Sequence, residues 1–117
     1  MIAKVLYVDD EPLNLKLFEL CFSKKCKVFV ANNGFEGLEQ LDKETDIMVI
    51  ISDMKMPGMN GIDFIKQAKA KYPSKKYYIM TGYDINEEIR KTLDSGLILR
   101  VLRKPFNATE IDQAISL

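Results

Sequence analysis

Five short apolar runs, rich in residues that favour β-strands, are spread along this chain, and each one ends in a polar residue. The runs cover residues 3–8, 27–31, 47–52, 77–80 and 101–103, and the polar residues that follow are Asp9-Asp10, Asn32, Asp53, Thr81 and Lys104. Segments of helical periodicity lie between the runs, which is typical of βαβ units wound around a parallel sheet. Because the carboxyl ends of parallel strands share one edge, where such sheets bind ligands, we expect these polar residues to converge there.

The periodic segments predict amphipathic helices. Pro12 suits the first turn of a helix that runs to about residue 24. Its apolar stripe consists of Leu13, Leu17, Leu20 and Cys21. After Pro57-Gly58, a pair suited to the centre of a type II turn, a helix is predicted over residues 61–71. Its sheet-facing residues are Ile62, Phe64, Ile65 and Ala68.

Capping signals set the limits of the last two predicted helices. Asp84 followed by Glu87 resembles a capping pair that opens the fourth helix, and Gly96 closes it. Asn107 with Glu110 repeats the arrangement for the final helix.

Length and charge limit the class of protein. A chain of 117 residues, 47% hydrophobic, suits one compact domain over residues 1–117. Its 17 basic residues balance 17 acidic ones without long blocks of either sign, so we expect no nucleic-acid binding by this domain. No leader-like segment or membrane-length apolar run is recognised, so we expect no membrane insertion and a cytoplasmic location.

Cysteine and histidine content excludes other chemistries. Cys21 and Cys26 have neither the CxxC spacing nor the histidines that a zinc site would need, so we expect ordinary free thiols. The complete absence of histidine excludes a histidine-centred triad and an internal phosphohistidine relay. Any phosphohistidine donor must therefore be another molecule.

The polar strand ends are suited to phosphoryl transfer onto a carboxylate. Clustered carboxylates such as Asp9, Asp10 and Asp53 repel one another and favour a hard divalent cation, for which Mg²⁺ is the expected ion. A carboxylate can attack phosphorus in line and become an acyl phosphate, while Lys104 and Thr81 contact phosphoryl oxygens. Taken singly, the acidic trio could merely complement a helix N-terminus, but the joint occurrence of four complementary strand ends favours a phosphate site.

Together these motifs resemble the receiver domain of two-component response regulators, over essentially the whole chain. The matching segments are Val8-Asp9-Asp10-Glu11, Ser52 to Gly61, Met80-Thr81-Gly82 and Lys104-Pro105-Phe106. The resemblance implies an α/β fold: a doubly wound, flavodoxin-like, five-stranded parallel sheet of order 2-1-3-4-5 with helices on both faces. It also implies a cis peptide before Pro105.

The resemblance assigns roles to the site residues. Asp53 would be the phosphoacceptor, and Lys104 would contact both Asp53 and the phosphoryl group. Asp10 and Asp53 would ligate Mg²⁺ directly, together with the backbone carbonyl of Lys55, whereas Asp9 would act largely through water.

A phosphorylation-activated switch in a two-component phosphorelay is the implied function. The phosphoryl group would come in trans from a sensor histidine kinase or a phosphotransfer protein, and the output would pass to an unknown partner or a fused output domain. The protein would not be a conventional enzyme, although it would catalyse its own phosphotransfer and slow self-dephosphorylation. Thr81 would move on phosphorylation and change the face formed by the fourth helix, fifth strand and fifth helix, a face through which a homodimer could also form.

One position departs from the family pattern, and two others could tune the lifetime of the acyl phosphate. Val101 stands where receivers usually carry an aromatic residue, so a rotating aromatic switch is doubtful here; Val101 could simply be a strand residue that faces the core, with an altered or weakly coupled switch as the alternative. Lys55 and Tyr83 should flank the path of water to phosphorus, unless they are only exposed loop side chains. We expect Tyr83 to slow dephosphorylation, whereas the direction of the Lys55 effect is open.

Two other functions remain as alternatives. A degenerate receiver could act as a docking module that needs no phosphorylation. An aspartyl-phosphate phosphohydrolase is a weaker alternative, because such enzymes place a DxD motif after the first strand and carry a cap for which this chain has no room.

Overall fold

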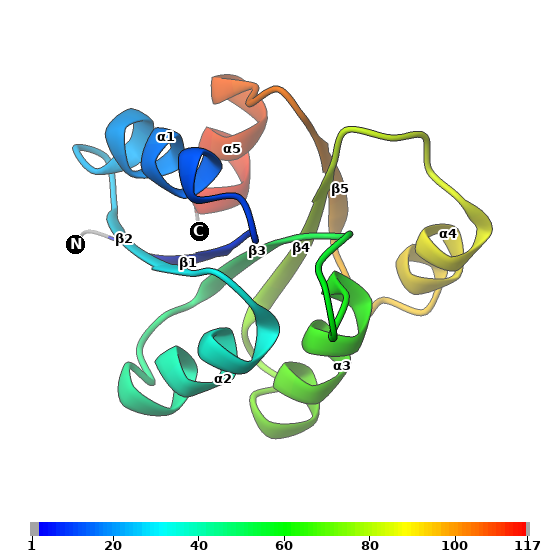
Figure 1. The fold of residues 1–117 in the computed structure, drawn as a ribbon. Coiled ribbons are helices and arrows are strands. Elements are labelled where there is room, and N and C mark those ends of the chain that lie inside the picture. The colour runs from blue at the N-terminus through cyan, green and yellow to red at the C-terminus, as the bar shows by residue number, and fades with distance from the viewer. Residues whose placement is uncertain (1–2, 117) are drawn as a thin grey trace.

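Residues 3–116 are described by a computed structural model, in which a five-stranded parallel sheet of order β2-β1-β3-β4-β5 forms the centre (Figure 1). The strands are β1 (Lys4–Val8), β2 (Lys27–Ala31), β3 (Val49–Asp53), β4 (Lys76–Thr81) and β5 (Arg100–Arg103). The predicted α/β class, strand order and parallel pairing are therefore confirmed. Residues 1, 2 and 117 of the predicted domain lie outside the described residues.

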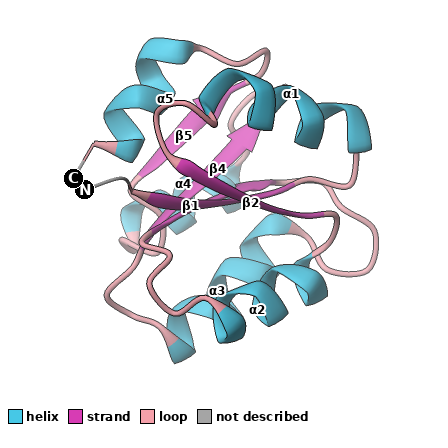
Figure 2. Cartoon of the chain, turned by 90° about the vertical axis from the view of Figure 1, so that its left-hand side faces the viewer, coloured by secondary structure: helices cyan, strands magenta, loops and turns pink. Residues whose placement is uncertain are grey.

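Helices cover both faces of the sheet. They are α1 (Pro12–Phe22), α2 (Gly34–Lys43), α3 (Gly61–Lys71), α4 (Glu87–Asp94) and α5 (Ala108–Ile115). Seen from the side, α1 and α5 lie on one face, and α2 and α3 lie on the other (Figure 2). The fold is thus doubly wound, as predicted.

The two faces bury separate apolar layers. One contains residues of α2, α3 and α4, including Leu41, Phe64 and Ile89, which pack on the sheet. The other contains Phe18 and Phe22 of α1 together with residues of α5. Strand β3 is buried along its whole length, including the polar Ser52 and Asp53 at its end, as expected of a central parallel strand.

The strand register brings the polar strand ends to the same edge. Val8, the last residue of β1, pairs with Ser52, so β3 ends one residue further on, at Asp53. Asp53 in turn pairs with Met80, directly before Thr81. Thr81 pairs with Arg103, directly before Lys104.

The apolar stripe predicted on the first helix faces solvent. Leu13 and Leu20 are 66% and 71% exposed, and Leu17 is 41% exposed, whereas Phe18 and Phe22 supply the buried side of α1. Helix α1 is apolar on more than one side, so periodicity alone does not identify the side that packs. The larger aromatic side chains bury more apolar area against the sheet, which favours their burial.

Of the two predicted N-terminal helix caps, one is confirmed and one is wrong. The Asn107 side chain accepts a hydrogen bond from the Glu110 N–H, as predicted. Asp84 as the cap of the fourth helix was wrong, because Asn86 accepts from the Ile89 N–H and α4 begins at Glu87. Gly96 follows the end of α4 with a φ of +80°, the conformation expected of a terminating glycine.

Two glycines shape the loop between β3 and α3. Gly58 has a φ of +82°, a conformation that favours glycine. The predicted type II turn is replaced by a tighter γ-turn centred on Gly58, because the Met59 N–H donates to the Pro57 carbonyl at 2.9 Å. Gly61 packs so closely on the Asp53 carbonyl that any Cβ at this position would collide with it. This contact anchors the start of α3 beneath the end of β3.

Within residues 3–116, no helix combines the length and apolar character needed to cross a bilayer.

Candidate functional site

Three carboxylates gather at the carboxyl edge of the sheet. Asp9 and Asp10 follow β1, Asp53 ends β3, and one oxygen from each lies within 4.8 Å of the others. A hollow of about 470 Å³ adjoins them. Its lining residues are Asp9, Asp10, Glu11, Asn14, Asp53, Lys55, Gly82, Tyr83 and Lys104. Sequence segments far apart therefore meet in one acidic cluster, defined here as Asp9, Asp10 and Asp53.

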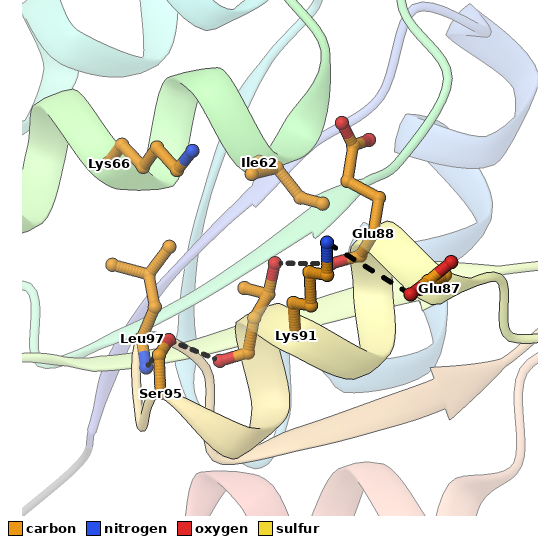
Figure 3. A pocket seen from close by; sticks show the side chains of 8 residues that line it. Ile62, Lys66, Glu87, Glu88, Lys91, Ser95 and Leu97 are labelled. Atoms are coloured by element: carbon orange, nitrogen blue, oxygen red, sulfur yellow. Dashed lines mark hydrogen bonds and ion pairs between the residues drawn. The ribbon is translucent and has the colours of Figure 1, made fainter.

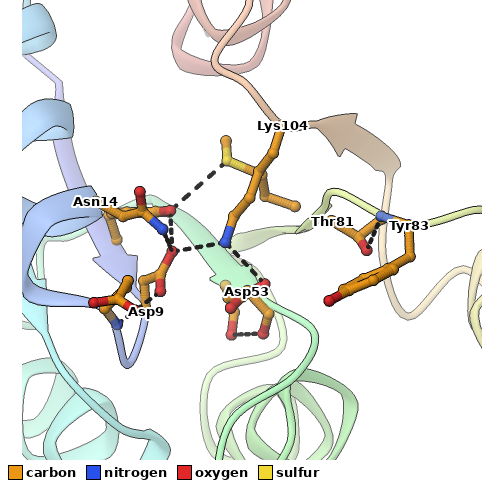
Figure 4. Close-up of polar contacts among 10 residues, drawn as sticks. Asp9, Asn14, Asp53, Thr81, Tyr83 and Lys104 are labelled. Carbon is orange, nitrogen blue, oxygen red and sulfur yellow. Dashed lines mark hydrogen bonds and ion pairs between the residues drawn. The ribbon is translucent and has the colours of Figure 1, made fainter.

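Lys104 links two members of the acidic cluster (Figure 4). Its Nζ lies 3.0 Å from Asp9 Oδ2 and 3.2 Å from Asp53 Oδ1. The backbone N–H of Lys104 donates to the Thr81 carbonyl at 3.0 Å, which continues the pairing of β4 with the chain beyond β5. The peptide between Lys104 and Pro105 is cis, as the family resemblance implied.

Asp9 is fully buried and surrounded by donors. Its Oδ1 accepts from the Glu11 N–H at 3.0 Å. Its Oδ2 accepts from the Tyr7 hydroxyl at 2.5 Å and from Asn14 Nδ2 at 3.2 Å, besides the Lys104 ammonium. Since its oxygens already have these partners, Asp9 is poorly placed to give up an oxygen to a further ligand.

Burial and charge shift the proton affinities in this cluster. Burial raises the pKa of the Asp53 carboxyl, and the attraction of Lys104 only partly offsets this effect. Burial acts to lower the pKa of Lys104, but its hydrogen bonds and ion pairs with Asp9 and Asp53 outweigh burial and raise that pKa. The pKa of Tyr7 is raised far above its ordinary range, first by burial and then by the hydrogen bond to Asp9, so its hydroxyl stays a donor.

Thr81 and two flanking side chains lie beside the cluster. The Thr81 hydroxyl oxygen accepts from the Tyr83 N–H at 3.1 Å (Figure 4). Across the opening, Lys55 Nζ lies 4.2 Å from the centre of the Tyr83 ring, within the range of a cation–π contact. Lys55 and Tyr83 therefore connect the loop after β3 with the loop after β4.

The donor set of the acidic cluster fits a hard divalent cation. Carboxylate oxygens are the ligands that Mg²⁺ uses in proteins, usually alongside several waters. Asp10 is exposed and makes no ion pair within residues 3–116, whereas Asp9 is enclosed by its donors. The carboxylates best placed to hold a cation directly are therefore those of Asp10 and Asp53.

Two contributors to the site were missed from the sequence, Tyr7 and Asn14. Side chains two residues apart on a strand point to the same face, so Tyr7 on β1 could have been paired with Asp9 by position alone. Asn14 lies in the first turn of α1, five residues after Asp9, and only the path of the chain at Glu11 and Pro12 brings its amide back to the carboxylate.

A separate hollow of about 560 Å³ lies between α3 and α4 (Figure 3). Ile62 and Leu97 contribute apolar surface to it, and Lys66 lines it from α3. On α4, Lys91 Nζ lies 4.0 Å from Glu87 Oε1. None of the acidic cluster lines this hollow, and its mixed charges indicate no single class of ligand.

Val101 belongs to the core in this structure. Its side chain is partly buried against the apolar layer of α2, α3 and α4. Val101 does not line the acidic hollow, whereas Tyr83 does.

A five-stranded sheet of this order, with an acidic cluster and a lysine at its carboxyl edge, has the fold and site expected of a two-component receiver domain. The family model described as the response regulator receiver domain matches residues 5–116, and the chain belongs to this family.

Named relatives agree with this assignment. Sporulation initiation phosphotransferase F of Bacillus subtilis is 33% identical over 116 residues, which cover 98% of this chain and 92% of that protein. The two-component response regulator ARR17 of Arabidopsis thaliana is 32% identical, with 93% of this chain and 80% of the relative covered. Among solved structures, a response regulator receiver domain protein from Clostridium thermocellum is similar, with a TM-score of 0.86, 29% identity, and coverage of 97% of this chain and 91% of the other.

Proposed function

We propose that Asp53 accepts a phosphoryl group from a phosphohistidine on another protein, with Mg²⁺ held by the acidic cluster, and that this event switches the domain between two signalling states. The observation that carries the proposal is the single ammonium of Lys104 between Asp9 and Asp53. An ammonium that is held beside a buried carboxylate can also bind a negatively charged phosphoryl group attached to that carboxylate.

The reaction uses groups already in position. The Asp53 carboxylate attacks phosphorus, an oxygen–phosphorus bond forms, and the bond from phosphorus to the histidine nitrogen breaks. The released nitrogen keeps the electron pair and takes up a proton. Lys104 then interacts with a phosphoryl oxygen. The Thr81 oxygen uses a lone pair to accept from Tyr83, so its hydroxyl hydrogen remains available to a second phosphoryl oxygen.

Asp10, Asp53 and the Lys55 carbonyl are the groups we assign to Mg²⁺, with Asp9 acting through water. The exposure of Asp10 and the enclosure of Asp9 support this division. When bound, the cation neutralises charge on the transferring phosphoryl group. Slow hydrolysis of the acyl phosphate by water returns Asp53 to its starting state.

The phosphoryl donor must be a second molecule because this chain has no histidine. A sensor histidine kinase or a phosphotransfer protein fits this requirement.

The exposed leucines of α1, Leu13, Leu17 and Leu20, lie on the helix that starts beside Asp9 and Asp10, and we assign them to contact with the donor. Leu20→Asp should slow transfer from a phosphohistidine protein that labels the native chain, while its labelling by acetyl phosphate should match that of the native chain. If the variant and the native chain are labelled by the phosphohistidine protein at the same rate, this assignment is wrong.

The output is proposed to pass through the face of α4, β5 and α5, either to a separate partner, to a fused output domain or to a second copy of the chain. Residues 1–117 would act as one receiver domain in this scheme. Movement of Thr81 toward the phosphoryl group would disturb its bond with the Tyr83 N–H and shift the loop that leads to α4.

Mass spectrometry of the intact protein tests the proposal. The native chain and Asp53→Asn are incubated with acetyl phosphate, each with and without Mg²⁺. We expect a gain of one phosphoryl group that requires Mg²⁺, is removed by hydroxylamine and is absent from the variant.

Other outcomes would point elsewhere. No adduct, together with no binding of beryllofluoride, would favour a docking module that works without phosphorylation. Repeated turnover of a small phosphate ester would favour a phosphohydrolase.

A further inference from the structure

The phenol of Tyr7 occupies a fixed position beneath the acidic cluster. Tyr7 is fully buried, and its ring stacks on Phe18 with centroids 4.5 Å apart and planes 14° apart. Phe106 meets the same ring edge-on at 5.9 Å. Aromatic packing on two sides leaves the ring little freedom, so the hydroxyl is held at one point. That point lies 2.5 Å from Asp9 Oδ2.

Tyr7 and Lys104 share one acceptor atom. Asp9 Oδ2 accepts from the Tyr7 hydroxyl and also faces the Lys104 ammonium at 3.0 Å. Lys104 is at the same time 3.2 Å from Asp53 Oδ1. Every donor that satisfies Asp9 reduces its need for Lys104, because a buried carboxylate is stabilised by the sum of its hydrogen bonds.

We propose that Tyr7 is a positioning residue that keeps Asp9 satisfied while Lys104 transfers from Asp9 to the phosphoryl group on Asp53. This inference rests on the proposed function of the site. Asp9 has no exposed surface and so cannot turn to bulk water when the ammonium leaves. Besides the water through which we assign it to Mg²⁺, it would retain the Tyr7 hydroxyl, the Asn14 amide and the Glu11 N–H. Without Tyr7, Asp9 would hold Lys104 more firmly and the phosphorylated state would be harder to reach.

Loss of the Tyr7 hydroxyl should affect Mg²⁺ and the phosphoryl group differently. Removing the Tyr7 hydroxyl takes no ligand from Mg²⁺, and it leaves Asp9 with more negative charge to offer to a hydrated cation. Phosphoryl binding, in contrast, requires Lys104 to leave Asp9. Tyr7→Phe should therefore weaken a phosphoryl analogue without weakening Mg²⁺. A lesion of packing alone would weaken both.

The test measures Mg²⁺ binding by calorimetry and beryllofluoride binding, at saturating Mg²⁺, by fluorine NMR. Tyr7→Phe keeps the ring that packs against Phe18 and removes only the hydroxyl. Tyr77→Phe is the matched control, since Tyr77 is also buried and donates to a carbonyl, that of Tyr72, at 2.8 Å. Far-ultraviolet circular dichroism verifies that each variant is folded.

We expect Tyr7→Phe to weaken beryllofluoride binding about tenfold, the scale of one hydrogen bond to a charged group, and to leave the Mg²⁺ dissociation constant within about twofold or tighter. Tyr77→Phe should change neither affinity. Equal weakening of both ligands by Tyr7→Phe, or no change in beryllofluoride binding, would overturn the inference.

A double-mutant cycle isolates the route through Asp9. In an Asp9→Asn background, Tyr7→Phe should cause no further loss of beryllofluoride affinity, and a full additional loss would overturn the inference even if Tyr7→Phe also loosens the fold. Failure of the proposed function has a different signature, since the native protein would then bind no beryllofluoride in the presence of Mg²⁺, and the role of Tyr7 would fall with it.

Discussion

Replacing Lys104 with methionine should destabilise the fold through the two carboxylates that it leaves behind. Asp9 is fully buried and Asp53 is 9% exposed, so neither can recover its lost partner from bulk water. At 3.0 Å and an effective dielectric constant of about 20, each ion pair is worth about 5 kcal/mol before desolvation is subtracted. Removal of one partner from a buried ion pair costs about 3–5 kcal/mol. Because the Lys104 side chain is 22% exposed, we take the lower end, about 3 kcal/mol.

Urea denaturation in metal-free buffer measures this loss, with Lys66→Met on the exposed side of α3 as the matched control. In a parallel thermal melt, the midpoint of unfolding should fall by about 10 °C for Lys104→Met, given the size of the domain. The control should stay within about 0.5 kcal/mol of the native chain. Millimolar Mg²⁺ should restore part of the loss, because a divalent cation neutralises the same carboxylates. A loss below about 1 kcal/mol, the value of a surface ion pair, would refute the reasoning, and so would a loss that Mg²⁺ leaves unchanged.

Three further predictions follow from the same edge of the sheet. Burial makes the pKa of Asp53 higher in the folded than in the unfolded chain, so ionisation of Asp53 destabilises the fold as pH rises through the interval between these two pKa values. Asp53→Asn should therefore raise the free energy of unfolding at pH 7, measured by urea titration without metal, and this gain should vanish by about pH 3. A gain independent of pH would contradict this. Gly61→Ala should cost about 2 kcal/mol and slow labelling by acetyl phosphate, because the new Cβ collides with the Asp53 carbonyl; native stability and labelling would contradict this. If the exposed Tyr83 ring beside Lys55 flanks the path of water, as we propose, Tyr83→Gly should speed loss of the acyl phosphate several-fold in a mass-spectrometric time course. Unchanged decay would assign both side chains to the loop surface alone.

The sequence predicted the sheet well because the signals that define it are local. Strand β3 begins with three apolar residues, Val49 to Ile51, and ends at Ser52 and Asp53, and a short buried run that ends in a polar residue is typical of a central parallel strand. Parallel order then brings the strand ends together without any knowledge of side-chain packing. The final helix was equally clear, because Asn107 is the one capping residue directly before it.

The failures arose where the chain offered two local solutions of similar energy. Asp84 and Asn86 are both good capping residues, and the sequence does not show which of them accepts from the first turn; in the structure Asn86 does, with Ile89 buried. Leucines and phenylalanines in α1 form two competing apolar sides, and the sequence pattern emphasised the exposed one. Tyr7 was missed because an aromatic residue within an apolar strand is usually read as core. Its ring is indeed core, but its hydroxyl belongs to the site.

The register of the strands has a consequence for local opening of the protein. Asp9 lies near the start of the chain and Lys104 near its end, and their contact exists only when β1, β3, β4 and β5 are aligned. Local opening of any one of these four strands would therefore separate the site residues. Amide hydrogens of the first and last strands should exchange more slowly together when a ligand binds, as in a cooperative unit that opens only by global unfolding. A ligand at this edge would thus report on the integrity of the whole domain.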